Sequence, residues 1–110
     1  MELADADREA LFRLFFEEAE EGLLAMEQAL MALEESPQDL EPQRTLFRVA
    51  HTIKGNAVSL GFSDLAAMTH GLEDGLDALR SGSAVVTREV IDLLLESVDA
   101  LRDLLTEAKG

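Results

Sequence analysis

With 110 residues, 23 acidic side chains against nine lysines and arginines, and a formal net charge of −14, the chain is long enough for one domain and too acidic to bind nucleic acids or anionic lipid surfaces. It has no cysteine, which excludes disulfides, thiolate metal sites and a cysteine nucleophile, and agrees with a reducing compartment. No apolar run approaches the roughly 18 residues of a membrane span, and the acidic start MELADADREA is unlike a targeting peptide, so we expect a cytoplasmic protein with protein partners.

From Asp7 onward, apolar residues recur every three or four positions, which places them on one side of an α-helix. The pattern predicts a first helix over about residues 7–35, ended by the proline-containing segment ESPQDLEP. The residues expected to face inward are Phe12, Phe15, Ala19, Leu23, Met26, Leu30 and Leu33.

Three further helices follow the same apolar spacing. The second is predicted over about residues 40–60 and ends at Gly61. Ser63 and Thr87 are suitable N-caps for a third helix over about 63–81 and a fourth over about 87–109. Four amphipathic helices with short connections predict an all-α, antiparallel up-and-down four-helix bundle. The inward residues are Leu46, Ala50, Ile53, Ala57 and Leu60, then Leu65, Met68, Leu72, Leu76 and Leu79, then Ile91, Leu94, Val98, Leu101 and Leu105.

Both histidines fall on the water-facing side of their predicted helices. Successive helical residues turn by about 100°, so His51 lies about 160° from the inward Ile53. His70 lies about 160° from the inward Leu72, whereas Glu73 lies about 100° from it and points along the groove between helices. An ordinary surface histidine is the simplest interpretation of His51, so its neighbours decide whether it has a function.

The surroundings of His51 are basic although the chain as a whole is acidic. All 23 acidic residues lie outside residues 42–63, where an even distribution would place about five of them. Arg48 and Lys54 lie one helical turn on either side of His51, and Arg44 lies two turns before it. This local positive charge favours a dianionic group at His51.

Gly55 follows His51 by four residues, in a helix interior where glycine costs about 1 kcal/mol relative to alanine. Close helix packing is one explanation. Helical geometry places Gly55 on the exposed side, so we favour space cleared for a bulky group or an approaching partner. Phe47 and Val58 flank the same face, either as an apolar docking rim or as contacts to a neighbouring helix.

A histidine with one ring nitrogen held by a carboxylate presents the other nitrogen as a nucleophile. Glu73 is the candidate partner for His51 Nδ1 if the third helix packs beside the second. Nε2 would then be unprotonated and point outward. The alternative is that Glu73 is a solvated surface charge.

The segment LFRVAHTIKGNAVSLGFSDLAAMTHGLED, together with FFEEAEEGLLAMEQALMALE before it, resembles histidine phosphotransfer (Hpt) domains, most closely the N-terminal phosphotransfer domain of CheA-type chemotaxis histidine kinases. The resemblance covers nearly the whole chain. It implies that His51 is phosphorylated on Nε2 and that Glu73 holds Nδ1. It also implies that Lys54 assists the phosphoryl group electrostatically and that His70 joins the hydrogen-bond network. Asn56 departs from the family, which commonly has glycine or another small residue there.

The resemblance further implies a relay of two-component signalling. A CheA-type, ATP-dependent kinase domain would phosphorylate His51, and an aspartate of a response-regulator receiver would take the group. The chain has no G-x-x-x-x-G-K-[ST] loop, so we expect ATP and Mg²⁺ on partner domains and none bound here. Family members often have a fifth helix, so we expect this chain to be the N-terminal piece of a larger kinase, monomeric in isolation. The expected docking residues are Arg44, Phe47, Arg48 and Val58.

Two other functions are compatible with the sequence. Di-metal bundles use inward Glu-x-x-His pairs on two helices, whereas this chain offers one reversed, outward pair, His70 with Glu73. The second alternative is an interaction bundle in which His51 is never phosphorylated. It shares the fold and the docking surface, but the presence of His51, Lys54, Gly55 and Glu73 together argues against it.

Overall fold

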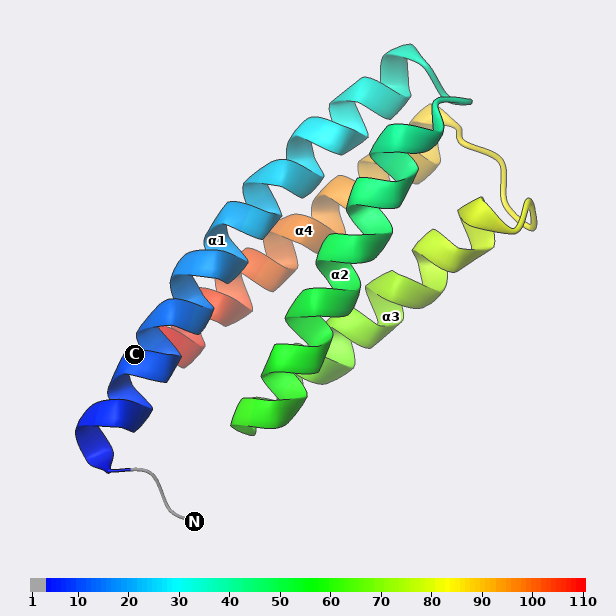
Figure 1. The fold of residues 1–110 in the computed structure, drawn as a ribbon. Coiled ribbons are helices and arrows are strands. Elements are labelled where there is room, and N and C mark those ends of the chain that lie inside the picture. Colours follow the sequence, from blue (N-terminus) through cyan, green and yellow to red (C-terminus); the bar gives the residue numbers. More distant parts are fainter. Residues whose placement is uncertain (1–3) are drawn as a thin grey trace.

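The computed structural model describes residues 4–110, which form four α-helices in a bundle (Figure 1). The helices are α1 (Asp5–Glu35), α2 (Leu40–Leu60), α3 (Ser63–Arg80) and α4 (Arg88–Lys109). α1 and α3 each pack against both α2 and α4, so the four helices form a closed ring in which sequence neighbours run antiparallel. The predicted antiparallel four-helix bundle is confirmed, and each predicted boundary lies within two residues of the observed one.

The core consists of the apolar faces of all four helices, and most of the predicted inward residues are buried in it. Phe12 and Leu60 are half-buried at its margin. The prediction for Met68 is wrong, because this side chain is 38% exposed and Thr69 is fully buried instead. Thr69 Oγ1 donates a hydrogen bond of 2.5 Å to the carbonyl oxygen of Leu65, which satisfies the hydroxyl inside the core. The other four predicted residues of α3 are buried, and Thr69 and Glu73 extend this buried face beyond the apolar residues.

Two of the three predicted helix-end residues have the predicted role. Gly61 ends α2 with a φ of 83°, a left-handed conformation that favours glycine. Thr87 Oγ1 accepts a hydrogen bond of 3.2 Å from the backbone N–H of Val90 and so caps α4. The prediction for Ser63 is wrong, because Phe62 occupies the N-cap position of α3 and no side chain caps that end.

Aromatic packing accounts for the start of α3. The ring of Phe62 stacks on Phe15 with ring centroids 5.4 Å apart, and it also contacts Phe12 and Phe16. These contacts anchor the α2–α3 connection to α1, so hydrophobic packing fixes this helix entry without a polar cap.

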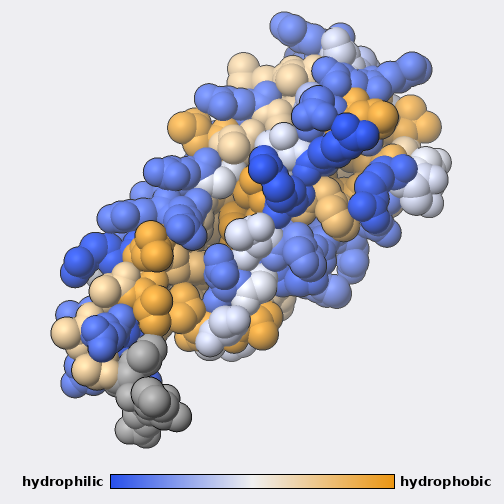
Figure 2. Space-filling model, viewed as in Figure 1, coloured by the Kyte–Doolittle hydropathy of each residue, from blue (hydrophilic) through white to orange (hydrophobic). Residues whose placement is uncertain are grey.

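Hydrophilic side chains cover much of the surface, interrupted by apolar patches, one of which lies between α1 and α2 (Figure 2). Within residues 4–110, no helix combines the length and the hydrophobicity that a membrane-spanning helix needs.

Candidate functional site

Three polar side chains meet where the middle of α2 packs against α3. His51 and Lys54 lie one turn apart on α2, and Glu73 reaches them from α3. Glu73 Oε2 lies 2.7 Å from His51 Nδ1, and Glu73 Oε1 accepts a hydrogen bond of 2.5 Å from Lys54 Nζ. A single carboxylate therefore holds both side chains of α2.

Exposure increases across this cluster from the carboxylate to the imidazole. Glu73 is buried, with 8% of its surface exposed, whereas the side chain of His51 is 67% exposed. The interpretation of Glu73 as a solvated surface charge is thus excluded. The carboxylate therefore holds Nδ1 of the imidazole, while the rest of the ring is open to partners.

The protonation of Glu73 determines which nitrogen of His51 is free. The hydrogen bond from Lys54 lowers the pKa of Glu73; burial opposes this effect, and the hydrogen bond from His51 reinforces it. An ionised carboxylate only accepts hydrogen bonds, so Nδ1 of His51 must carry the proton. In the neutral imidazole, Nε2 then has a free lone pair, the form in which the ring acts as a nucleophile.

Gly55 lies in open space beside the histidine. A Cβ placed on Gly55 would meet no atom within 4 Å, so close helix packing does not explain this glycine. The closely packed glycine is Gly22 of α1, where an added Cβ would lie 2.9 Å from Cγ1 of Val49. The structure thus keeps the clearance interpretation for Gly55 and assigns the packing role to a residue that spacing alone did not single out.

The two apolar residues expected to flank the site differ in accessibility. Val58 is 64% exposed, whereas Phe47 is half-buried beneath the guanidinium of Arg80, whose Cζ lies 4.1 Å from the ring centroid. Arg80 also donates a hydrogen bond of 2.9 Å to Asp77 on the same helix. Sequence analysis missed Arg80 as a neighbour of the site. The antiparallel pairing of α2 and α3, which brings the end of one helix opposite the start of the other, is the signal that could have revealed it.

The two arginines expected at the docking surface are both exposed. Arg44 donates a hydrogen bond of 2.9 Å to Glu41, one turn earlier on α2. Among the ion pairs of residues 4–110, none involves Arg48. Arg48 is therefore the cation of α2 that an acidic partner could engage without displacing another side chain.

His70 is separate from the cluster in this structure. Its exposed ring places Nε2 3.7 Å from Asp74 Oδ2, and within residues 4–110 no hydrogen bond joins it to His51 or Glu73. Its role in the hydrogen-bond network stays a prediction. The described residues include no group of three or more histidine or acidic side chains placed to hold a metal ion.

The fold and the site define a class of protein before any comparison is made. A rigid helical bundle presents one histidine, oriented through Nδ1 by a buried carboxylate and accessible at Nε2. The ring lies at the exposed surface, where a group carried by another protein can reach Nε2. This is the arrangement of a carrier that exchanges a group between protein partners.

The comparisons with known proteins agree with this class. The chain belongs to the Hpt domain family, whose model matches residues 10–107. The chemotaxis protein CheA of Borreliella burgdorferi is 38% identical over 105 residues, which are 96% of this chain and 12% of that protein. CheA of Klebsiella aerogenes is 42% identical over 103 residues, which are 94% of this chain and 16% of that protein. The chain thus spans a small part of the length of these relatives.

Solved structures extend the similarity to three dimensions. The CheA phosphotransferase domain from Thermotoga maritima is 32% identical with a TM-score of 0.84, and the match covers 94% of this chain and 97% of that one. The phosphorylated P1 domain of CheA3 in complex with CheY6 from R. sphaeroides is 32% identical with a TM-score of 0.80, covering 89% and 77%. The family resemblance is confirmed: the chain is an Hpt domain similar to the phosphotransfer domain of CheA.

Proposed function

We propose that this Hpt domain carries a phosphoryl group from a CheA-type histidine kinase domain to the receiver domain of a response regulator, and that His51 is the phosphoacceptor. The observation that carries the proposal is the 2.7 Å contact of Glu73 Oε2 with His51 Nδ1, on a ring that is otherwise exposed. Support also comes from the relatives named CheA and from the related phosphorylated domain that binds CheY6.

In the first step, the lone pair of His51 Nε2 attacks the γ-phosphorus of ATP held by the kinase. The N–P bond forms, the bond from phosphorus to the bridging oxygen breaks, and ADP leaves with that electron pair. The attack makes the imidazole cationic, and the ionised Glu73 opposite Nδ1–H stabilises this charge. Phosphoryl transfer depends mainly on in-line positioning and charge stabilisation, so an oriented exposed ring is sufficient on this side of the reaction.

In the second step, a carboxylate oxygen of the receiver aspartate attacks the phosphorus and the N–P bond breaks. The electron pair returns to Nε2, and the imidazole leaves as a neutral group because Nδ1 keeps its proton. Glu73 thus serves both directions of transfer by holding one tautomer of His51.

Lys54 has two roles in this mechanism. Its ammonium holds Glu73 in place at 2.5 Å and keeps the carboxylate ionised. It also lies one helical turn from His51, where its positive charge assists a bound phosphoryl group. The proposal gives Arg44, Arg48, Phe47 and Val58 a part in partner docking and His70 a part in the surrounding network.

The remaining parts of the proposal concern the parent protein. ATP and Mg²⁺ belong to the partner domains, and the domain works as a monomer in the cytoplasm at the N-terminal end of a larger kinase. The relatives, which are several times longer than this chain, support a larger parent protein. The absence of cysteine agrees with a reducing compartment.

The test is phosphoryl incorporation by wild type, His51→Gln and the matched control His70→Gln. Each is incubated with ATP, Mg²⁺ and a CheA-type kinase catalytic fragment already shown to phosphorylate another Hpt domain, and intact mass spectra are recorded. We expect one added phosphoryl group, lost in acid and kept in alkali, on wild type and His70→Gln but not on His51→Gln.

Two results would contradict the proposal. Incorporation that survives His51→Gln would show that another residue is the acceptor. No incorporation into wild type, by a fragment active on the other domain, would favour a docking bundle in which His51 is not phosphorylated.

A further inference from the structure

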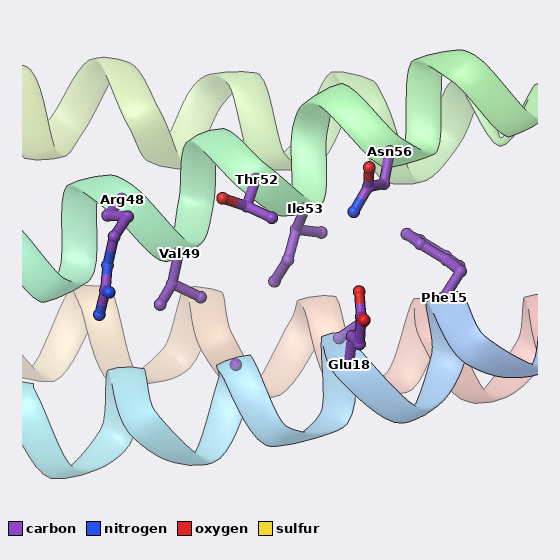
Figure 3. A pocket seen from close by; sticks show the side chains of 9 residues that line it. Phe15, Glu18, Arg48, Val49, Thr52, Ile53 and Asn56 are labelled. Atoms are coloured by element: carbon purple, nitrogen blue, oxygen red, sulfur yellow. The ribbon is translucent and has the colours of Figure 1, made fainter.

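Two apolar hollows of the bundle differ in their relation to His51. The pocket between α1 and α2 has a volume of about 190 Å³, and its lining includes Arg48, one turn before the histidine (Figure 3). The hollow between α3 and α4, here called the α3–α4 groove, is larger at about 470 Å³ and contains no residue of α2. Gly71 and Gly75 line it, whereas Glu73 between them faces α2. The α3–α4 groove therefore opens on the side of α3 away from the histidine.

The lining of the α3–α4 groove is apolar and only partly covered. α3 and α4 make the least extensive contact of the four neighbouring helix pairs. Met68 is 38% exposed on one helix, and Leu93 is 61% exposed on the other. The lining also includes Leu72, Leu79 and Leu94. An apolar side chain of a partner in this groove would remove from water the surface that these helices leave open.

Two glycines in the interior of α3 keep the groove open. Gly71 and Gly75 lie one turn apart, at positions where glycine weakens a helix relative to alanine. A Cβ added to either would meet no atom within 4 Å, so packing inside this bundle does not require them. Residues without side chains let another helix lie close to the backbone of α3. The pair therefore suits an additional helix that runs along the groove.

Both rims of the α3–α4 groove are acidic. On α3, Asp74 lies about 60° from Gly71, on the outer side of the helix. On α4, Glu89 and Glu96 lie about 40° and 60° from Leu93, also on the outer side. All three carboxylates are exposed. Among the ion pairs of residues 4–110, none involves Glu89 or Glu96, so both are available to a basic partner.

The lysine and arginines of α3 and α4 do not neutralise these rims. Arg80 contacts α2, and Arg102 and Lys109 pair with acidic residues of α1. The fourth, Arg88, lies about 140° from Leu93 around α4. No charged residue lines the groove itself. The result is an apolar strip between two acidic edges, which is complementary to an amphipathic helix with basic residues beside its apolar face.

A second copy of the chain does not fit this pattern. It would bring a net charge of −14 to the contact, together with the same acidic rims. Repulsion between the two copies would oppose their association. Charge complementarity therefore favours a basic partner over self-association.

We propose that the α3–α4 groove docks a basic amphipathic helix of another protein. The lining extends from Val90 to Ala100 along α4, about 15 Å, which corresponds to about three turns of the docked helix. Its apolar residues, spaced by three or four positions, lie against Leu93 and the two glycines, and its lysines or arginines pair with the rim acids. The docked helix leaves His51 accessible, because the groove opens on the other side of α3.

The test uses a fluorescent synthetic peptide of about 14 residues, with leucines spaced by three or four positions and lysines and alanines elsewhere. A scrambled peptide of the same composition lacks the apolar face. Fluorescence anisotropy is expected to show binding to the wild-type domain at least about tenfold tighter for the amphipathic peptide. In ¹⁵N NMR spectra, the amide shifts should be largest between Met68 and Leu79 and between Val90 and Ala100, and small at His51.

Two variants with matched controls locate the binding site. Gly75→Leu fills the groove, and Ala32→Leu adds a leucine to the exposed face of α1. Glu96→Lys reverses one rim charge, and Glu21→Lys makes the same charge change on α1. Circular dichroism melting checks that each variant folds. Gly75→Leu and Glu96→Lys are expected to weaken peptide binding at least about tenfold relative to their controls.

The contrary results can be told apart. Equal affinity for both peptides would show that charge alone attracts them, and no binding to the folded wild type would show that the groove does not accept a basic helix. Variants that bind like their controls, or amide shifts centred on His51, would place the peptide elsewhere. Self-association of wild type in analytical ultracentrifugation, abolished by Gly75→Leu, would assign the groove to a second copy. Each of these results would overturn the proposal, and none depends on phosphorylation of His51.

Discussion

The proposed chemistry of this domain depends on one buried carboxylate. Glu73 lies at the edge of the buried face of α3, and its two oxygens contact two different side chains of α2. Lys54 offsets the cost of burying the negative charge of Glu73, so the carboxylate stays ionised. Its second oxygen then faces Nδ1 of His51. Lys54 thus supports, through Glu73, the tautomer of His51 that the carboxylate selects.

Glu73→Gln tests this arrangement through its pH dependence. The folded-state pKa of Glu73 is lowered from the ordinary value of 4.5, so its stabilising contribution is fully present above about pH 4.5 and is lost as pH falls through the lower folded pKa. We expect Glu73→Gln to reduce the free energy of unfolding by about 1–3 kcal/mol at neutral pH, and by progressively less in acid. Urea denaturation at several pH values measures the difference.

The exposed neighbouring carboxylate provides the control for this experiment. Asp74→Asn is expected to change stability by less than about 1 kcal/mol across the same pH range, because its side chain is open to solvent. A deficit of Glu73→Gln that stays constant from neutral pH to strong acid would show that the carboxylate's charge is not what stabilises the cluster.

Sequence analysis identified His51, Lys54 and Glu73 because a helical repeat fixes which side of a helix each residue occupies. It could not show that Glu73 is buried, since that depends on how α3 is rotated against α2. Arg80 was missed for the same reason: its contact with Phe47 depends on the pairing of two helices and has no signature in either one.

The individual helices show that a suitable residue type does not by itself make a cap. Thr87 accepts the hydrogen bond of Val90 N–H, whereas Ser63 is already inside α3 and the packed ring of Phe62 precedes it. Polar capping therefore stabilises the start of α4, and aromatic packing stabilises the start of α3. The sequence alone contains both candidates without this distinction.

This difference predicts unequal effects of two similar substitutions. Thr87→Ala is expected to lower the free energy of unfolding by about 1 kcal/mol, because it leaves a backbone N–H of the first turn without its partner. Ser63→Ala is expected to change it by no more than about 0.5 kcal/mol, because no cap bond is lost. Equal losses in urea denaturation would contradict the assignment of the two helix starts.

For the whole molecule, apolar spacing was sufficient to predict the bundle and its helix boundaries. The lateral packing was less predictable, as Met68 and Thr69 show: apolar spacing placed Met68 inside, whereas Thr69 beside it is the buried residue. The close approach of α1 and α2 at Gly22 was also invisible in the sequence, because it depends on Val49 of another helix. Features within one helix were thus predictable, whereas features between helices required the structure.

The charge distribution gives the molecule one distinct working face. Acidic residues are absent from residues 42–63, and this segment contains His51, Lys54 and Gly55, where an added Cβ would meet no other atom. The surrounding acidic surface disfavours other anions elsewhere on the domain. This charge distribution agrees with the proposed transfer of a phosphoryl group at this part of α2.

The position of the phosphorus on the imidazole tests the central claim most directly. The domain, labelled with ¹⁵N in its histidines, is phosphorylated by the kinase fragment, and phosphorus–nitrogen couplings are measured by NMR. We predict phosphorus on Nε2 of His51 and a proton on Nδ1, because Glu73 holds Nδ1 as a hydrogen-bond donor. Phosphorus on Nδ1 would contradict the account, since that nitrogen could not then keep its contact with the carboxylate.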